Sequence, residues 1–229
     1  MSGIDDAYTV VLLHMNGADA STTFTDESGK AWTRAGAAQI DTAQSKFGGA
    51  SGLFAAGTTD DINTPDLDIW QLDDGSNSTK WTVDFWCRFN GDPGVAIMGF
   101  ISQRSAAATQ WNIRLNNNAL ELNNGDGSIA MTKAWNPATA VWYHVAVVKD
   151  GTTYYMFVDG TLLTSSYSSN AVLQNVPDTL KIGKSGTADY FTGWLDEFRI
   201  SRGIARWTTG FALPVGEYDP FTPQIRFYA

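Results

Sequence analysis

The chain has little cysteine and no excess of positive charge. Cys87 is its single cysteine, so no disulfide can form within the chain. Its 15 Lys and Arg residues are outnumbered by 24 Asp and Glu residues, which gives a net charge of −9. Binding to nucleic acids or to anionic lipids requires clustered Lys and Arg. The composition therefore argues against a nucleic-acid partner and against docking on a membrane surface.

Targeting and membrane-spanning segments are also lacking. The first ten residues, MSGIDDAYTV, contain neither a basic segment nor an apolar segment, so they predict no signal peptide. No apolar run approaches the roughly 20 residues that cross a bilayer, so we predict no membrane insertion.

The sequence shows no recognisable catalytic arrangement. Retaining glycosidases need two carboxyl groups about 5 Å apart on one face. Asp196 and Glu197 are adjacent on a predicted strand, where consecutive side chains point to opposite faces. No nucleophile-elbow motif supports a Ser/His/Asp triad. We therefore predict that the protein is not an enzyme.

What the chain does contain is the pattern of an all-β protein. Hydrophobic residues make up 43% of the sequence and there are 22 glycines, enough for a sizeable core and many tight turns. Strand-like runs recur about every 10 to 15 residues, bounded by Gly, Asn, Asp and Pro. Asp-Gly pairs at 150–151 and 159–160 favour two-residue hairpin turns. The pattern predicts one two-sheet antiparallel β-sandwich.

The segment from Phe191 to Arg206, FTGWLDEFRISRGIAR, is the most informative. Strict alternation would place Asp196 on one face with Trp194, Phe198 and Ile200. A carboxylate among such neighbours is costly unless a cation, a metal or hydrogen bonds satisfy it. We therefore expect Asp196 to connect this late strand to another part of the chain.

Several segments together resemble a known family. They are LLHMNGADASTTFTDESGKAW (12–32), SKFGGASGLF (45–54), WTVDFWCRF (81–89), WYHVAVVKDGTTYYMFVDGTLL (142–163) and the segment 191–206. They resemble the laminin-G-like, concanavalin A-like jelly-roll domains, particularly those of bacteriophage virion proteins and bacterial surface proteins. The resemblance runs from about Val10 to Tyr218. It implies a jelly-roll domain over residues 1–218 followed by a C-terminal tail, residues 219–229.

The resemblance also implies a structural calcium ion. In many of these domains Ca²⁺ joins the first loop to the last strand, and calcium prefers six to eight oxygen ligands. Asn16, Asp26 and Asp196 match the oxygen-bearing positions, so we predict that they bind the ion. The alternative is that Asp26 caps a turn and that Asp196 accepts backbone N–H groups.

A polar sheet face is the candidate ligand site. Asp84, Trp86 and Arg88 alternate with the apolar side chains of one predicted strand, and Asn112 and Arg114 do so on another. If these strands lie in one sheet, the five side chains form a surface of carboxylate, amide, guanidinium and indole groups. Sugars bind to such surfaces by stacking and by hydrogen bonding. The alternative is an ordinary solvated sheet face.

We therefore predict a non-catalytic recognition module whose partner is a surface glycan. The jelly-roll resemblance and the absence of an export signal favour a phage virion adhesin or decoration protein, which acts outside the cell. One alternative is a structural virion module that binds other virion proteins. Another is an accessory module of a secreted glycoside hydrolase. The apolar end of the tail (Ile225, Phe227 and Tyr228) predicts either pairing with an edge strand or homo-oligomerisation.

Overall fold

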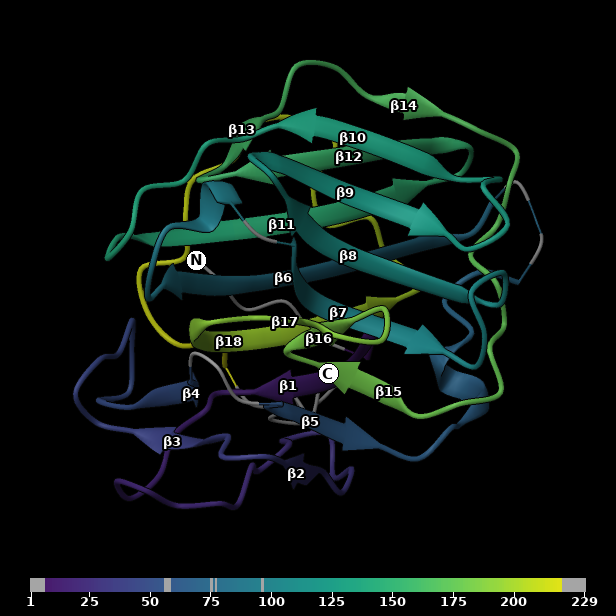
Figure 1. The fold of residues 1–229 in the computed structure, drawn as a ribbon. Helices are drawn as coiled ribbons and strands as arrows, with labels where there is room; N and C mark the ends of the chain where they lie inside the picture. The colour runs from purple at the N-terminus through teal and green to yellow at the C-terminus, as the bar shows by residue number, and fades with distance from the viewer. Residues whose placement is uncertain (1–6, 56–58, 75, 77, 96, 220–229) are drawn as a thin grey trace, which may run out of the picture.

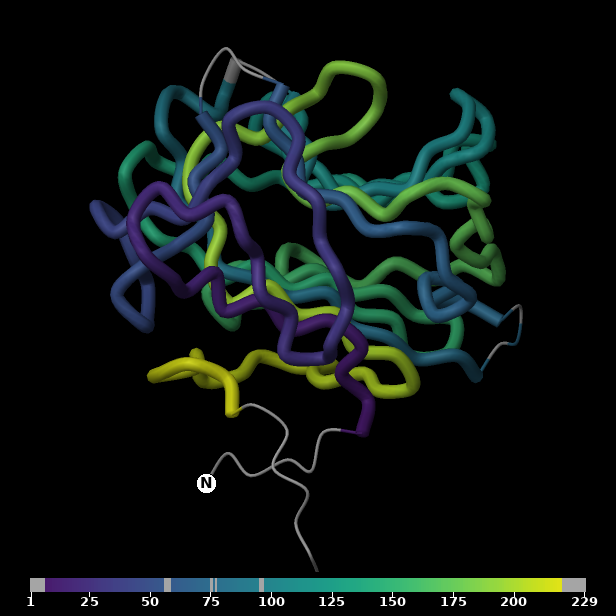
Figure 2. The backbone as a smooth tube through the Cα atoms, turned by 90° about the horizontal axis from the view of Figure 1, so that it is seen from below, coloured from purple at the N-terminus to yellow at the C-terminus, as the bar shows by residue number. Residues whose placement is uncertain are grey.

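The computed structural model describes residues 7–55, 59–74, 76, 78–95 and 97–219. Two layers of β-sheet face each other across a single core, as Figures 1 and 2 show. The expected all-β sandwich is confirmed. Short 3₁₀ turns at η1 (Asp68–Trp70) and η2 (Pro93–Val95) are the helical elements of the described residues. None of the helices described there is long and apolar enough to cross a membrane.

Sheet A has the strand order β13-β12-β11-β6-β18-β4-β3, with β1 beside β18 and β14 beside β12. Its strands are β1 (Thr9–Leu13), β3 (Gln39–Asp41), β4 (Ser51–Phe54), β6 (Lys80–Phe89), β11 (Trp142–Asp150), β12 (Thr153–Val158), β13 (Thr161–Leu162), β14 (Tyr167–Ser168) and β18 (Gly193–Arg202). Every pairing in this sheet is antiparallel.

Sheet B has the order β10-β9-β8-β7-β15-β5-β2, and the small hairpin β16–β17 joins it at β7. Its strands are β2 (Thr33–Ala35), β5 (Asp61–Thr64), β7 (Ile97–Arg104), β8 (Gln110–Asn116), β9 (Ala119–Asn124), β10 (Ala130–Ala134), β15 (Leu180–Ile182), β16 (Lys184–Ser185) and β17 (Asp189–Tyr190). The contact of β17 with β7 is parallel, and the other pairings are antiparallel.

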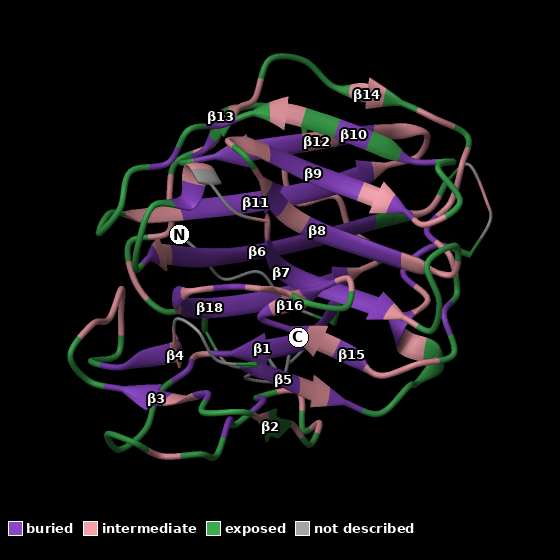
Figure 3. Ribbon diagram, in the orientation of Figure 1, coloured by how far each residue is buried: buried purple, intermediate pink, exposed green. Residues whose placement is uncertain are grey.

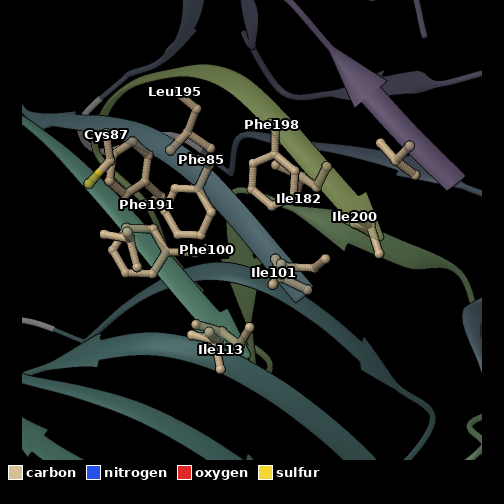
Figure 4. Packing of buried hydrophobic residues seen from close by; sticks show 14 of the residues in the cluster. Phe85, Cys87, Phe100, Ile101, Ile113, Ile182, Phe191, Leu195, Phe198 and Ile200 are labelled. Atoms are coloured by element: carbon tan, nitrogen blue, oxygen red, sulfur yellow. The ribbon is translucent and has the colours of Figure 1, made fainter. Parts of the chain in front are cut away.

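Aromatic side chains fill the space between the sheets (Figure 4). Phe85 of β6 stacks on Phe198 of β18 with ring centroids 4.9 Å apart, and its other neighbour is Phe100 of sheet B. Cys87 is fully buried in the same cluster, and burial raises the pKa of its thiol. The alternation of β6 therefore directs Phe85 and Cys87 into the core, as the sequence predicts.

A β-bulge interrupts β18. Leu195 pairs with Cys87 and Asp196 with Trp86, but the next pair along is Arg199 with Asp84, so β18 has one extra residue. The extra residue is Glu197, whose φ is +49°. Strict alternation was therefore the wrong prediction here: Asp196 lies on the outer side of sheet A, not with the apolar side chains of the core.

The C-terminal strap, residues 203–219, crosses the outer side of sheet A and appears as the yellow segment in Figure 2. Trp207 and Phe211 stack with centroids 4.0 Å apart and pack on the apolar side chains of β11 and β12. Figure 3 shows the result, because β6, β11 and β18 are buried along nearly their whole length. Sheet A is thus covered on both faces.

Candidate functional site

The five residues predicted to bind a glycan do not share one sheet. Asp84, Trp86 and Arg88 lie on β6 of sheet A, whereas Asn112 and Arg114 lie on β8 of sheet B. Both groups point away from the core, so they lie on opposite outer faces of the sandwich. The prediction of a single five-residue site is therefore wrong. The outward direction of these side chains within each strand was predicted correctly. The assumption that the two strands lie in one sheet was wrong.

Trp86 is not available as a sugar platform. Its side chain is buried, with 2% exposure. The Nζ of Lys46 lies 3.9 Å from the centre of the indole ring, and Phe47 packs against the ring edge. The loop after β3 therefore covers the ring face that stacking on a sugar would require.

Asp84 is the centre of a buried polar network. It accepts two hydrogen bonds from Arg199, both of 3.0 Å, and one of 2.5 Å from the hydroxyl of Tyr218. Burial would raise its pKa, but the charge of Arg199 and the bond to His144 hold the pKa well below its ordinary value. Asp84 therefore anchors the C-terminal strap to sheet A and offers no oxygen to a ligand.

Arg88 lies at the end of the same face. Its guanidinium carbon is 4.9 Å from the centre of the Trp194 ring. This contact and its position on β6 separate it from the two residues on sheet B.

The outer face of sheet B carries a continuous row of polar side chains. Its register runs from Asn123 through Asn112, Ser102 and Lys181 to Asn63, one residue from each of five adjacent strands. Residues on either side of the row extend it to the following set, which we call the polar face: Asn63, Ser102, Arg104, Gln110, Asn112, Arg114, Glu121, Asn123 and Lys181. Neighbouring β8 and β9 therefore align their polar side chains.

Three buried polar atoms of the polar face have no hydrogen-bond partner among the described residues. They are Arg104 Nε, Gln110 Oε1 and Asn112 Oδ1. Arg104 and Gln110 are a cross-strand pair, and Asn112 lies two residues from Gln110 on the same face. Directly opposed residues have Cβ atoms about 5 Å apart, so the three groups are neighbours. Asn112 is only 3% exposed. Buried polar groups without a partner are rare in proteins, and a ligand or an ordered water normally completes them.

Ion pairs fix the side chains at the other end of the polar face. Arg114 donates to Glu121 at 2.8 Å, and Glu121 also accepts from Asn116 and Asn123. The β16–β17 hairpin folds over β7 beside Arg114. A Cβ at Gly99 would lie 1.9 Å from the backbone nitrogen of Ser185, so only glycine permits this approach. The hairpin forms a raised edge to the polar face.

The site predicted from the sequence did not include Arg104, which lies two residues after Ser102 at the end of β7. The alternation continues two residues further, with Gln103 turned inward and Arg104 outward. That continuation is the signal that could have identified Arg104.

The three predicted calcium ligands each contact a different set of residues. Oδ1 of Asp26 accepts hydrogen bonds from the Leu12 amide, the Ser28 amide and the Ser28 hydroxyl, and Oδ2 accepts one from the Trp32 indole. These neighbours are donors, whereas calcium needs oxygen acceptors around it. These contacts are the ones expected from the alternative, a turn cap, and the assignment of Asp26 to a calcium site stays a prediction.

Asp196 is satisfied in part by the loop after β3. Its Oδ2 accepts the amide hydrogens of Lys46 and Phe47 at 2.7 and 3.1 Å, while its Oδ1 has no partner among the described residues. Burial raises the pKa of Asp196 to about 7, although the two amide bonds oppose this. The expected tie between the last strand and a distant segment is present, and backbone N–H groups make it.

Asn16 lies in a separate cluster, where its amide donates to Glu217 at 2.5 Å. His14, Glu197 and Glu217 there bring potential ligand atoms within 4.8 Å of one another. His14 Nδ1 is 2.6 Å from Glu197 Oε1, and this bond raises the pKa of His14 against the effect of burial. The neighbouring carboxylates thus favour protonation of the imidazole. The bulge at Glu197 explains this position, since strict alternation would direct Glu197 into the core.

A family model for the concanavalin A-like lectin/glucanases superfamily matches residues 56–205. The chain belongs to this superfamily. The match covers most of both sheets, including β6, β8 and β18, and agrees with the laminin-G-like resemblance. No curated protein matches the chain.

Solved structures show the same fold at low identity. The binding domain of Paraclostridial mosquitocidal protein 1 aligns with a TM-score of 0.66 and 15% identity over 88% of this chain. Domain 4 of AbnA, an extracellular GH43 arabinanase from Geobacillus stearothermophilus seen with arabinotriose, aligns with a TM-score of 0.63 and 16% identity over 87%. Botulinum neurotoxin type C, whose cell entry depends on two ganglioside molecules, aligns with a TM-score of 0.61 and 15% identity over 85%.

The share of each solved chain that this protein covers differs. The chain spans about half the length of the two toxin chains, 50% and 48%, but 95% of the arabinanase domain. At these identities the likeness concerns the fold.

Proposed function

We propose that the protein is a non-catalytic carbohydrate-binding module and that the glycan binds on the polar face of sheet B. The observation that carries this proposal is the group of three unpaired buried atoms at Arg104, Gln110 and Asn112. A sugar hydroxyl both donates and accepts hydrogen bonds, so adjacent hydroxyls complement one donor and two acceptors. Such a ligand removes the cost of leaving these groups unpaired.

A pocket of about 510 Å³ borders the polar face and extends the surface available to a glycan. Amide and carboxylate side chains line it, including Gln71, Asp126 and Gln174. Gln174 connects it to the polar face, because its Oε1 accepts the backbone amide hydrogen of Gln110 at 2.8 Å. An oligosaccharide bound at Gln110 could therefore reach the pocket.

The test is a glycan array with the wild-type chain, Asn112→Ala and a control, Asn90→Ala. Asn90 is exposed in the loop after β6, outside the polar face. Asn112→Ala should weaken binding about tenfold, the effect of about one lost hydrogen bond, while Asn90→Ala should not.

A stability measurement separates binding from a structural role. Asn112 Oδ1 has no partner, so its removal should leave the free energy of unfolding unchanged or raise it. A destabilised Asn112→Ala variant, or an array without any binding by the wild type, would contradict the proposal.

A carbohydrate-binding module of this kind could belong to either of two classes of protein. The phage-type resemblance of several segments supports a virion adhesin that acts outside the cell, alone or as a homo-oligomer. The near-complete coverage of arabinanase domain 4 supports an accessory module of a secreted glycoside hydrolase. Binding to intact host cells, compared with binding to isolated plant polysaccharides, distinguishes them. The apolar end of the predicted tail lies outside the described residues.

A further inference from the structure

The cations of the polar face differ in how they are neutralised. Arg114 pairs with Glu121 at 2.8 Å, and Lys181 lies 3.8 Å from Asp178. Lys184, on the hairpin at its edge, donates to the hydroxyl of Tyr190 at 2.7 Å and lies over the Tyr190 ring. Each of these cations therefore has an identified partner.

Arg104 is the exception. No carboxylate of the described residues lies within 4.0 Å of its guanidinium, and no hydrogen bond from its side chain is formed there. Its Nε is buried without an acceptor. A buried donor on a charged group costs more when unpaired than a neutral donor does. In a chain with a net charge of −9, an unmatched guanidinium on a sheet face is unexpected.

The neighbours of Arg104 define what would complete it. Gln110 Oε1 and Asn112 Oδ1 are acceptors that take hydroxyl donors, whereas Arg104 offers donors in a planar fork. Carboxylates match this fork in a bidentate geometry. A sugar that carries both hydroxyl groups and a carboxylate satisfies all three groups at once.

We propose, on the basis of the function proposed above, that the glycan is a carboxylated one, such as a uronic-acid or sialic-acid sugar. Arg104 binds the carboxylate, and Gln110 and Asn112 bind the hydroxyls beside it. A neutral sugar leaves the charge of Arg104 unmatched, so the carboxylate determines specificity.

The experiment uses an array that carries acidic glycans, the same glycans after chemical reduction of their carboxylates to alcohols, and sulfated glycans. The variants are Arg104→Gln, Arg104→Lys and the control Arg88→Gln. Arg88 gives the same change in net charge on the opposite face of the sandwich. It therefore controls for non-specific attraction of polyanions.

The wild type should prefer each acidic ligand over its reduced form by at least about tenfold, because a hydrogen bond between charged groups is stronger than one to a neutral alcohol. Arg104→Gln should remove this preference and retain weak binding of both forms. Arg104→Lys should keep part of the preference for the acidic ligand, and Arg88→Gln should keep all of it.

Equal or tighter binding of the reduced glycans, or a preference for sulfated ones, would overturn the carboxylate assignment and leave the proposed function standing. Retention of the preference in Arg104→Gln would overturn the role of Arg104. If no glycan of any kind binds, the proposed function fails as well.

Discussion

Replacement of Asp196 by Asn should stabilise the protein, and more so at high pH. Asp196 has no exposed surface, and burial raises its pKa from 3.8 to about 7 in the folded chain. The folded state therefore binds the proton more tightly than the unfolded state does. Ionisation costs stability as the pH rises from the unfolded pKa to the folded one.

The size of the effect follows from the two pKa values. Each pH unit between them corresponds to about 1.4 kcal/mol. At pH 8.5 the ionised side chain costs up to about 4 kcal/mol, and at pH 5.5 about 2 kcal/mol less. Asn keeps an oxygen for the amides of Lys46 and Phe47 and carries no charge. The stabilisation by Asp196→Asn should thus be larger at pH 8.5 by about 2 kcal/mol.

Urea unfolding of the two chains at pH 5.5 and 8.5 measures this difference, with Asp92→Asn at an exposed position as the control for net charge. A variant that is less stable than the wild type at both pH values would refute the reasoning and would indicate that Asp196 binds a cation. A second result would also refute it: EDTA lowers the stability of the wild type but not that of Asp196→Asn.

Three further changes test other parts of the fold by chemical unfolding. Tyr218→Phe removes the hydrogen bond from the strap to Asp84 and should cost about 1.5–3 kcal/mol; an unchanged stability would show that the strap is not anchored there. The pKa of His14 is raised, so the stability from its ion pair is present below pH 6.5 and lost as the pH rises through the folded pKa; His14→Gln should flatten the profile above pH 6.5. Asp73→Ala leaves Lys149 buried without its partner and should cost about 3–5 kcal/mol, part of which Lys149→Met should restore in the double variant.

The alternation of apolar and polar side chains within a strand could be recognised in the sequence, and it placed Phe85 and Cys87 in the core correctly. The hairpin signals also held, because β11 pairs with β12 and β12 with β13 around the two Asp-Gly turns. These features depend on residues close together in the chain, where turn chemistry and a period of two residues determine the structure.

The candidate site could not be predicted from the sequence, because it depends on contacts between segments that are far apart in the chain. The predicted site required β6 and β8 to lie in one sheet, and they do not. Pairing between strands that are distant in the chain cannot be recognised from the local sequence. The bulge at Glu197 adds one residue and reverses the faces beyond it. The burial of Trp86 depends on a loop 40 positions earlier in the chain, at Lys46.

The location of the ligand on the polar face is tested most directly by NMR titration of the isotopically labelled chain with the tightest glycan from the array. We predict that the side-chain amide signals of Gln110 and Asn112 and the Nε signal of Arg104 shift along one saturable curve, while the indole signal of Trp86 stays in place. Shifts at Trp86 without shifts at Asn112 would place the glycan on sheet A and contradict the proposed site.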